Sequence, residues 1–114
     1  MLTIDALKNF GADTETGLAR CMGNEALYLR LAASVVNEKG FERLKEAIDK
    51  EDYNAAFDAA HALKGAVGNL SITPLYDRIC EITELLREKK DADYAAMVSE
   101  LYSLKNEYAG LCAQ

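Results

Sequence analysis

The stretch YAAMVSELYSLKNEYAGL, residues 94–111, decides the fold class of this chain. Its large apolar side chains recur at intervals of three, four, three, four and three residues: Tyr94, Met97, Leu101, Leu104, Tyr108 and Leu111. This spacing places them on one face of an α-helix, whereas a half-buried β-strand would alternate every second residue. We therefore expect a long amphipathic helix that packs this face against other helices.

The same periodicity continues upstream and divides the chain into further helices. Thr73 and Pro74 predict a helix start, with Thr73 as the cap and Pro74 as the first helical residue, and the buried stripe is Leu75, Ile79, Ile82 and Leu86. Asn24 caps a long stretch in which Gly40 predicts a kink or break, and its apolar positions are Leu27, Leu31, Val35, Phe41, Leu44 and Ile48.

Two shorter helices precede that stretch, and one long helix follows it. The short helices span Thr3 to Phe10, ending at Gly11, and Thr14 to Cys21, closing at Gly23; the long one spans about Asp52 to Leu70. Long helices joined by short corners pack as antiparallel neighbours. The predicted fold is all-α: an antiparallel up-down four-helix bundle with one or two short additional N-terminal helices.

Composition bounds the function. The 114 residues suit a single domain, 1–114, and the net charge of −6 disfavours nucleic-acid and anionic-membrane binding. The three cysteines are odd in number and lack CxxC spacing, which favours a reducing compartment. Neither a signal peptide nor a run of 18 apolar residues is present, so we expect a cytoplasmic protein. The opening Met1 and the compact length suit a free-standing domain. A single histidine excludes multi-histidine metal sites, and no metal site is expected.

The helix predicted from Asp52 to Leu70 carries the candidate site. At 100° per residue, His61 lies opposite an apolar face made of Ala56, Ala59, Leu63, Ala66, Val67 and Leu70. Five further residues share the outward side with His61: Phe57, Asp58, Lys64, Gly65 and Gly68. We therefore expect His61 to be exposed.

The two glycines on this face need an explanation. Each costs about 1 kcal/mol of helix propensity relative to alanine, and no other glycine occurs between Phe41 and Ala109. Bare backbone beside the imidazole would let another molecule approach closely, and Lys64 would offer a positive charge to an anion carried on the ring. The alternative is structural: a surface histidine without function, and glycines that admit a neighbouring helix.

Other chemistry fits the pattern poorly. No serine or cysteine shares the His61 face, so a Ser–His or Cys–His hydrolase is disfavoured. A haem ligand would point into the bundle core, and His61 points away from it.

The residues His61-Ala62-Leu63-Lys64-Gly65 resemble the HxLKG signature of histidine-containing phosphotransfer (HPt) domains. The resemblance continues through Ala66 to Leu70 and upstream through Ala59 and Ala60. The N-terminal segments Gly17-Leu18-Ala19-Arg20 and Gly23-Asn24-Glu25, with Tyr28, also look like this family. The resemblance therefore covers about residues 13 to 110.

This resemblance implies a phosphorelay intermediate. His61 would accept a phosphoryl group from an aspartyl phosphate of a response-regulator receiver domain and pass it to another receiver, and Lys64 would steady the phosphoryl oxygens. Gly65, Gly68, Phe57 and Asp58 would belong to the docking surface. The chain would bind no cofactor, because Mg²⁺ belongs to the receiver, and it would have no kinase activity of its own. Its partners would be receiver domains and a hybrid sensor histidine kinase, and we expect a monomer.

Three positions depart from the family pattern. Ser71 stands where many members have glycine, Ala62 replaces a common hydroxyl residue, and Asp58 occupies a position that is often basic. Since a receiver pocket is acidic, Asp58 would weaken docking or select a particular partner. The second function class is a helical interaction domain that binds receiver or kinase domains without phosphotransfer.

Overall fold

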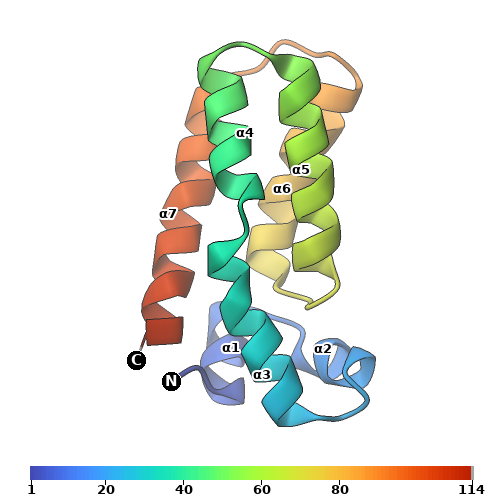
Figure 1. Cartoon of the computed structure of the whole chain (residues 1–114), viewed down its shortest axis with the longest axis vertical. Helices are drawn as coiled ribbons and strands as arrows, with labels where there is room; N and C mark the ends of the chain where they lie inside the picture. Colours follow the sequence, from blue (N-terminus) through green and yellow to red (C-terminus); the bar gives the residue numbers. More distant parts are fainter. Residues whose placement is uncertain (114) are drawn as a thin grey trace.

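The computed structural model describes residues 1–113, and all regular structure in that range is helical. Four helices form the bundle: α4 (Gly40–Asp49), α5 (Tyr53–Gly68), α6 (Thr73–Arg87) and α7 (Tyr94–Ala113). They run alternately up and down, and the ring closes because α7 packs on both α6 and α4 (Figure 1). The predicted all-α bundle is confirmed.

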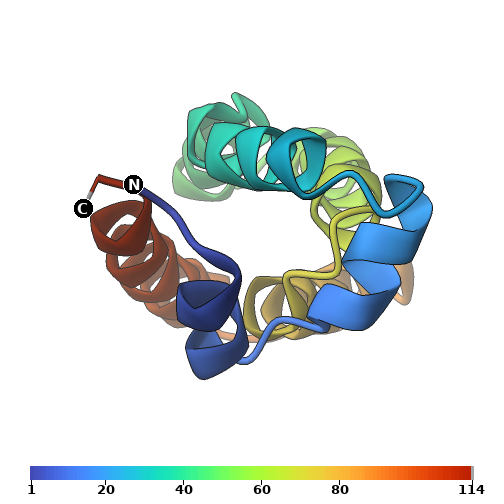
Figure 2. The same ribbon diagram turned by 90° about the horizontal axis from the view of Figure 1, so that it is seen from below.

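The remaining helices lie at one end of the bundle. Helices α1 (Ile4–Phe10) and α2 (Thr14–Arg20) cover that end, and α3 (Glu25–Ser34) leads into α4 through a 3-10 turn, Val35–Asn37 (Figures 1 and 2). The predicted caps hold: Thr3 accepts a hydrogen bond from the Ala6 amide, and Asn24 accepts one from the Leu27 amide. Short polar side chains at these positions satisfy amides that have no partner within the helix.

The break near Gly40 is confirmed and has a packing cause. Glu38 is extended, and Gly40 is the first residue of α4. A Cβ atom at Gly40 would come within 2.7 Å of the Leu63 side chain of α5. The bare backbone of Gly40 therefore lets α4 begin directly against α5.

The start of α6 differs by one residue from the expectation. Ile72, not Thr73, is the N-cap residue, and the helix begins at Thr73. The Thr73 hydroxyl donates to the Ser71 carbonyl oxygen at 3.3 Å and so caps no helix amide. Ser71 has φ 57°, the left-handed conformation that favours glycine, so the serine at this position adopts a strained backbone conformation.

One hydrophobic core joins the bundle to the N-terminal helices. It includes Leu7 of α1, Tyr28 of α3 and Tyr108 of α7. The Tyr108 hydroxyl donates to the Ala32 carbonyl at 2.6 Å, and the Tyr28 hydroxyl donates to the Leu70 carbonyl at 2.9 Å. These bonds fix α3 to α7 and to the turn that follows α5, the helix that carries His61.

Candidate functional site

Helix α5 holds His61 near its middle, on the outer surface. The Asp52 side chain caps the helix by accepting from the Ala55 amide at 3.2 Å. The inner face is anchored by buried residues, Ala56, Ala59, Ala60, Leu63 and Val67. Ala60 was not expected in this set and is buried because α5 packs on α6 as well as on α4. Ala66 and Leu70 are half-buried instead of buried, and Leu70 lies in the turn after α5. His61 is exposed, as predicted.

Phe57 orients the imidazole. Its ring stacks on His61 with centroids 5.7 Å apart and planes inclined by 19°. Phe57 is itself half-buried against the core, and the Arg87 guanidinium of α6 lies 5.3 Å from the centroid of its ring. Phe57 is thus only partly exposed, and its ring contacts both His61 and Arg87.

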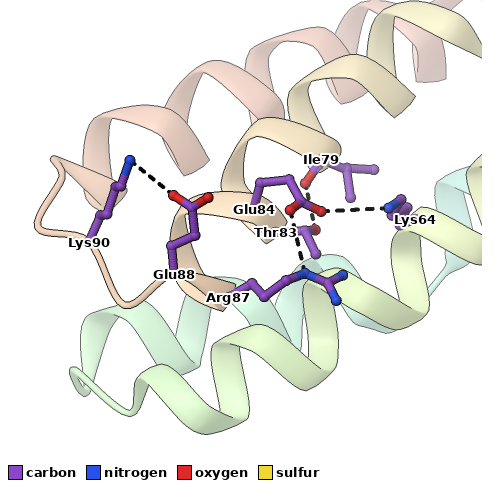
Figure 3. Close-up of polar contacts among 7 residues, drawn as sticks. All are labelled: Lys64, Ile79, Thr83, Glu84, Arg87, Glu88 and Lys90. Atoms are coloured by element: carbon purple, nitrogen blue, oxygen red, sulfur yellow. Dashed lines mark hydrogen bonds and ion pairs between the residues drawn. The ribbon is translucent and has the colours of Figure 1, made fainter.

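Lys64, one turn after His61, has an acidic partner on the neighbouring helix. Its Nζ lies 3.9 Å from Glu84 Oε1 of α6, and Glu84 Oε2 lies 3.4 Å from Arg87 Nε (Figure 3). One carboxylate therefore faces both cations. The sequence analysis assigned no role to Glu84 or Arg87, because helix periodicity does not show which side chains of another helix arrive opposite.

The two glycines of the His61 face differ in what surrounds them. A Cβ atom at Gly65 would meet nothing within 4 Å, so packing within the chain does not require glycine there. A Cβ atom at Gly68 would come within 2.7 Å of the Tyr76 ring of α6. The open space expected at both glycines therefore exists only at Gly65, since the neighbouring ring fills the space at Gly68.

A hollow of about 580 Å³ lies beside His61, between α2, the second half of α5 and the start of α6. We call it the His61 hollow; its lining includes Asp13, Arg20, His61, Lys64, Gly65 and Asp77. The Arg20 guanidinium donates to the Gly68 carbonyl at 2.8 Å, which fastens α2 to α5. Arg20 appeared in the sequence only within the family resemblance, because contact between segments 48 residues apart leaves no periodic signal.

Asp13 brings a negative charge to the same hollow. Its carboxylate accepts hydrogen bonds from the Thr16 hydroxyl at 2.7 Å and from the Thr16 amide at 3.2 Å, and these lower the pKa of Asp13. The hollow is therefore mixed in charge, because its lining includes Arg20 and Lys64 as well as Asp13 and Asp77.

Asp58 is exposed but does not line the His61 hollow. It borders a hollow between the α6–α7 corner and α5, together with Phe57, and also the groove between α4 and α5. Its charge therefore lies beside the first half of α5, away from the His61 hollow.

A comparison with protein-family models gives a match to the Hpt domain over residues 37–114. The chain belongs to the Hpt domain family. The match includes His61 and the whole four-helix bundle, whereas α1, α2 and α3 lie before it. Neither the curated proteins nor the solved structures include a significant match to the chain.

Membership in the Hpt domain family assigns a general role in two-component signalling, which is histidine phosphotransfer. Hpt domains in general interact with receiver domains and kinases. Within residues 1–113, no helix combines the length and apolar character needed to cross a bilayer. The residues that act at this particular site remain predictions.

Proposed function

We propose that this Hpt domain is a phosphorelay intermediate that carries a phosphoryl group on His61 between receiver-domain aspartates. The observation that carries the proposal is the exposed imidazole of His61 one turn before Gly65, whose missing side chain leaves open space. A glycine that internal packing does not require, placed beside a nucleophilic side chain, favours access by another macromolecule.

The chemistry needs little from this chain beyond position and charge. A lone pair on an unprotonated imidazole nitrogen attacks the phosphorus of the aspartyl phosphate, and a P–N bond forms as the P–O bond to the aspartate breaks. The aspartate leaves as a carboxylate, and the second ring nitrogen keeps its proton. Phosphoryl transfer depends mainly on alignment and charge neutralisation, so Phe57 would align the ring and Lys64 would bind the phosphoryl oxygens. The Mg²⁺ would come with the receiver.

The docking surface would extend along α5 on either side of His61. Gly65 would admit the receiver backbone, while Phe57, Asp58 and Gly68 would border the contact. The partners would be receiver domains and a hybrid sensor histidine kinase, with the chain acting as a monomer and without kinase activity of its own. We also propose a cytoplasmic location, because the three cysteines are odd in number and lack CxxC spacing.

The test is phosphoryl transfer from phosphorylated receiver domains, measured as a mass increase of one phosphoryl group. Because the chain contains one histidine, an acid-labile and alkali-stable phosphoryl group that is absent from His61→Gln identifies His61 as the acceptor. His61→Gln should abolish acceptance while the free energy of unfolding changes by about 0.5 kcal/mol or less, as is usual for a surface substitution. Binding of unphosphorylated receivers without any transfer would instead favour the interaction-only function.

A further inference from the structure

Among residues 1–113, Glu84 is the carboxylate that pairs with both Lys64 and Arg87. Its two oxygens divide between them: Oε1 lies 3.9 Å from Lys64 Nζ and Oε2 lies 3.4 Å from Arg87 Nε (Figure 3). Arg87 in turn lies over the Phe57 ring that stacks on His61. A chain of contacts therefore connects Glu84 of α6 with the imidazole through Arg87 and Phe57, while Lys64 lies one helical turn after His61 on α5.

The resting position of Lys64 follows from this arrangement. An ammonium group on a flexible side chain takes the orientation in which it meets the nearest negative charge. Before phosphorylation that charge is Glu84, across the α5–α6 boundary. Lys64 is thus drawn toward α6, and its charge is partly neutralised before any anion reaches His61.

This pairing is weak enough to exchange. The Lys64 and Glu84 side chains are 30% and 52% exposed, and ion pairs so open to water contribute little. A phosphoryl group on His61 would carry about two negative charges, against one on Glu84. Lys64 would then leave Glu84 for the phosphoryl oxygens.

We propose that Glu84 is a positioning residue that holds Lys64 in the unphosphorylated state and thereby opposes the arrival of a phosphoryl group at His61. This inference rests on the proposed function, since it takes His61 as the acceptor. Glu84 lies outside the HxLKG segment, on a different helix. In this proposal it influences the rate at which His61 is phosphorylated. Glu84 acts through Lys64 and does not touch the reacting atoms.

The experiment uses phosphoramidate as a small phosphoryl donor, so that no receiver is needed. The imidazole nitrogen attacks phosphorus, the P–N bond of the reagent breaks, ammonia leaves, and the new P–N bond forms on His61. The rate is followed by intact mass in low salt. Glu84→Gln should accelerate phosphorylation about two- to fivefold, the range expected for freeing one partner of an exposed pair.

The matched control is Glu81→Gln. Glu81 lies one turn earlier on α6, is also exposed, and pairs with Arg78 at 3.9 Å instead of with Lys64. It removes the same charge from the same helix, so it measures the general effect of one less anion on an anionic reagent. We expect it to change the rate by less than half as much as Glu84→Gln.

A double-mutant cycle separates positioning from a structural effect. In a Lys64→Ala background, Glu84→Gln should accelerate the reaction no more than Glu81→Gln does, because the side chain that it frees is gone. In the presence of Lys64, high salt should shrink the difference between the two variants. Urea unfolding of each variant establishes that all of them are folded.

Several results would overturn the inference. It is wrong if Glu84→Gln slows phosphorylation or matches Glu81→Gln, or if its effect persists without Lys64. It is also wrong if neither the wild type nor Glu84→Gln is phosphorylated on His61, because Lys64 would then have no phosphoryl group to bind at that residue. Since the donor is a small molecule, failure here leaves the receiver-transfer test unaffected, and failure with receivers leaves this test interpretable.

Discussion

The ring of Phe57 lies nearly parallel to the imidazole of His61, with the two centroids 5.7 Å apart. The residues are four positions apart in α5, so the helix itself brings them together. Within the described residues the imidazole forms no side-chain hydrogen bond, and the stack is the contact that sets its orientation while leaving it exposed. The imidazole of His61 is thus both accessible to a partner and held in one orientation by Phe57.

Replacing Phe57 should show how much this alignment contributes. Phe57→Leu keeps an apolar side chain but removes the stack and the contact with Arg87, so we expect about 1 kcal/mol less stability in urea unfolding. Phosphorylation of His61 should slow about two- to tenfold because the ring is less well oriented. Phe57→Tyr, which keeps the aromatic ring, is the control and should stay close to wild type. Equal rates for the two variants would contradict a role in alignment.

Gly65→Ala tests whether open space at this position serves a partner. A Cβ atom meets nothing within 4 Å, so the substitution should raise the free energy of unfolding by about 0.5 to 1 kcal/mol through helix propensity. Transfer from a receiver should slow, because the added methyl group occupies the approach to His61. Phosphorylation by phosphoramidate, a much smaller donor, should change less. Unchanged transfer with receivers would mean that Gly65 does not serve docking.

Gly68→Ala should have the opposite effect on stability. The new Cβ atom would lie 2.7 Å from the half-buried Tyr76 ring, and Gly68 is the last residue of α5, where helix propensity has least to add. We expect a loss of about 1 kcal/mol, typical of mild overpacking. Gly68→Ala combined with Tyr76→Leu should recover part of that loss. A stabilised single variant would show that the ring moves aside freely.

The charges of Lys64 and Asp58 should bias receiver transfer in opposite directions. Lys64→Ala should slow transfer clearly, because it removes a cation close to the phosphoryl group. Asp58→Lys should speed association with acidic receiver pockets, and the gain should be larger at low salt, where exposed charges are screened less. Transfer rates measured across a salt series provide the check. Shifts of the two variants in the same direction, or rates independent of salt, would refute this electrostatic account of docking.

Because of Tyr108, we expect the free energy of unfolding to decrease in the alkaline pH range. Burial raises the pKa of its hydroxyl above the ordinary tyrosine value of about 10, and the hydroxyl donates to Ala32. Above pH 10 the unfolded chain ionises this group while the folded chain keeps it protonated, so the free energy of unfolding should fall as pH rises. Tyr108→Phe should lose about 1 kcal/mol at pH 8 and show a shallower decline from pH 9 to 11. Urea unfolding at each pH measures both effects, and an equal decline in the two proteins would contradict the assignment.

Much of the fold was predictable because helices are specified locally. The caps Thr3 and Asn24, the Gly11 terminus and the buried stripe of α6 all follow from side chains within one or two turns. The exposure of His61 follows from the same periodicity. Prediction was less accurate at two places. Ala60 is buried because a neighbouring helix covers α5 on a second side. Ile72 is the N-cap of α6 instead of Thr73, whose hydroxyl donates to the Ser71 carbonyl in the preceding turn.

The amino-acid sequence by itself determined the helical class, the outward face of α5 and the residues His61, Lys64 and Gly65 on it, since each depends on angles along a single helix. Only the tertiary structure decided that Gly68 admits the Tyr76 ring, that Arg20 fastens α2 beside the site, and that Lys64 faces Glu84. These contacts join segments whose meeting depends on how the whole core packs. Periodicity tells which face of a helix is free, and packing tells what lies across from it.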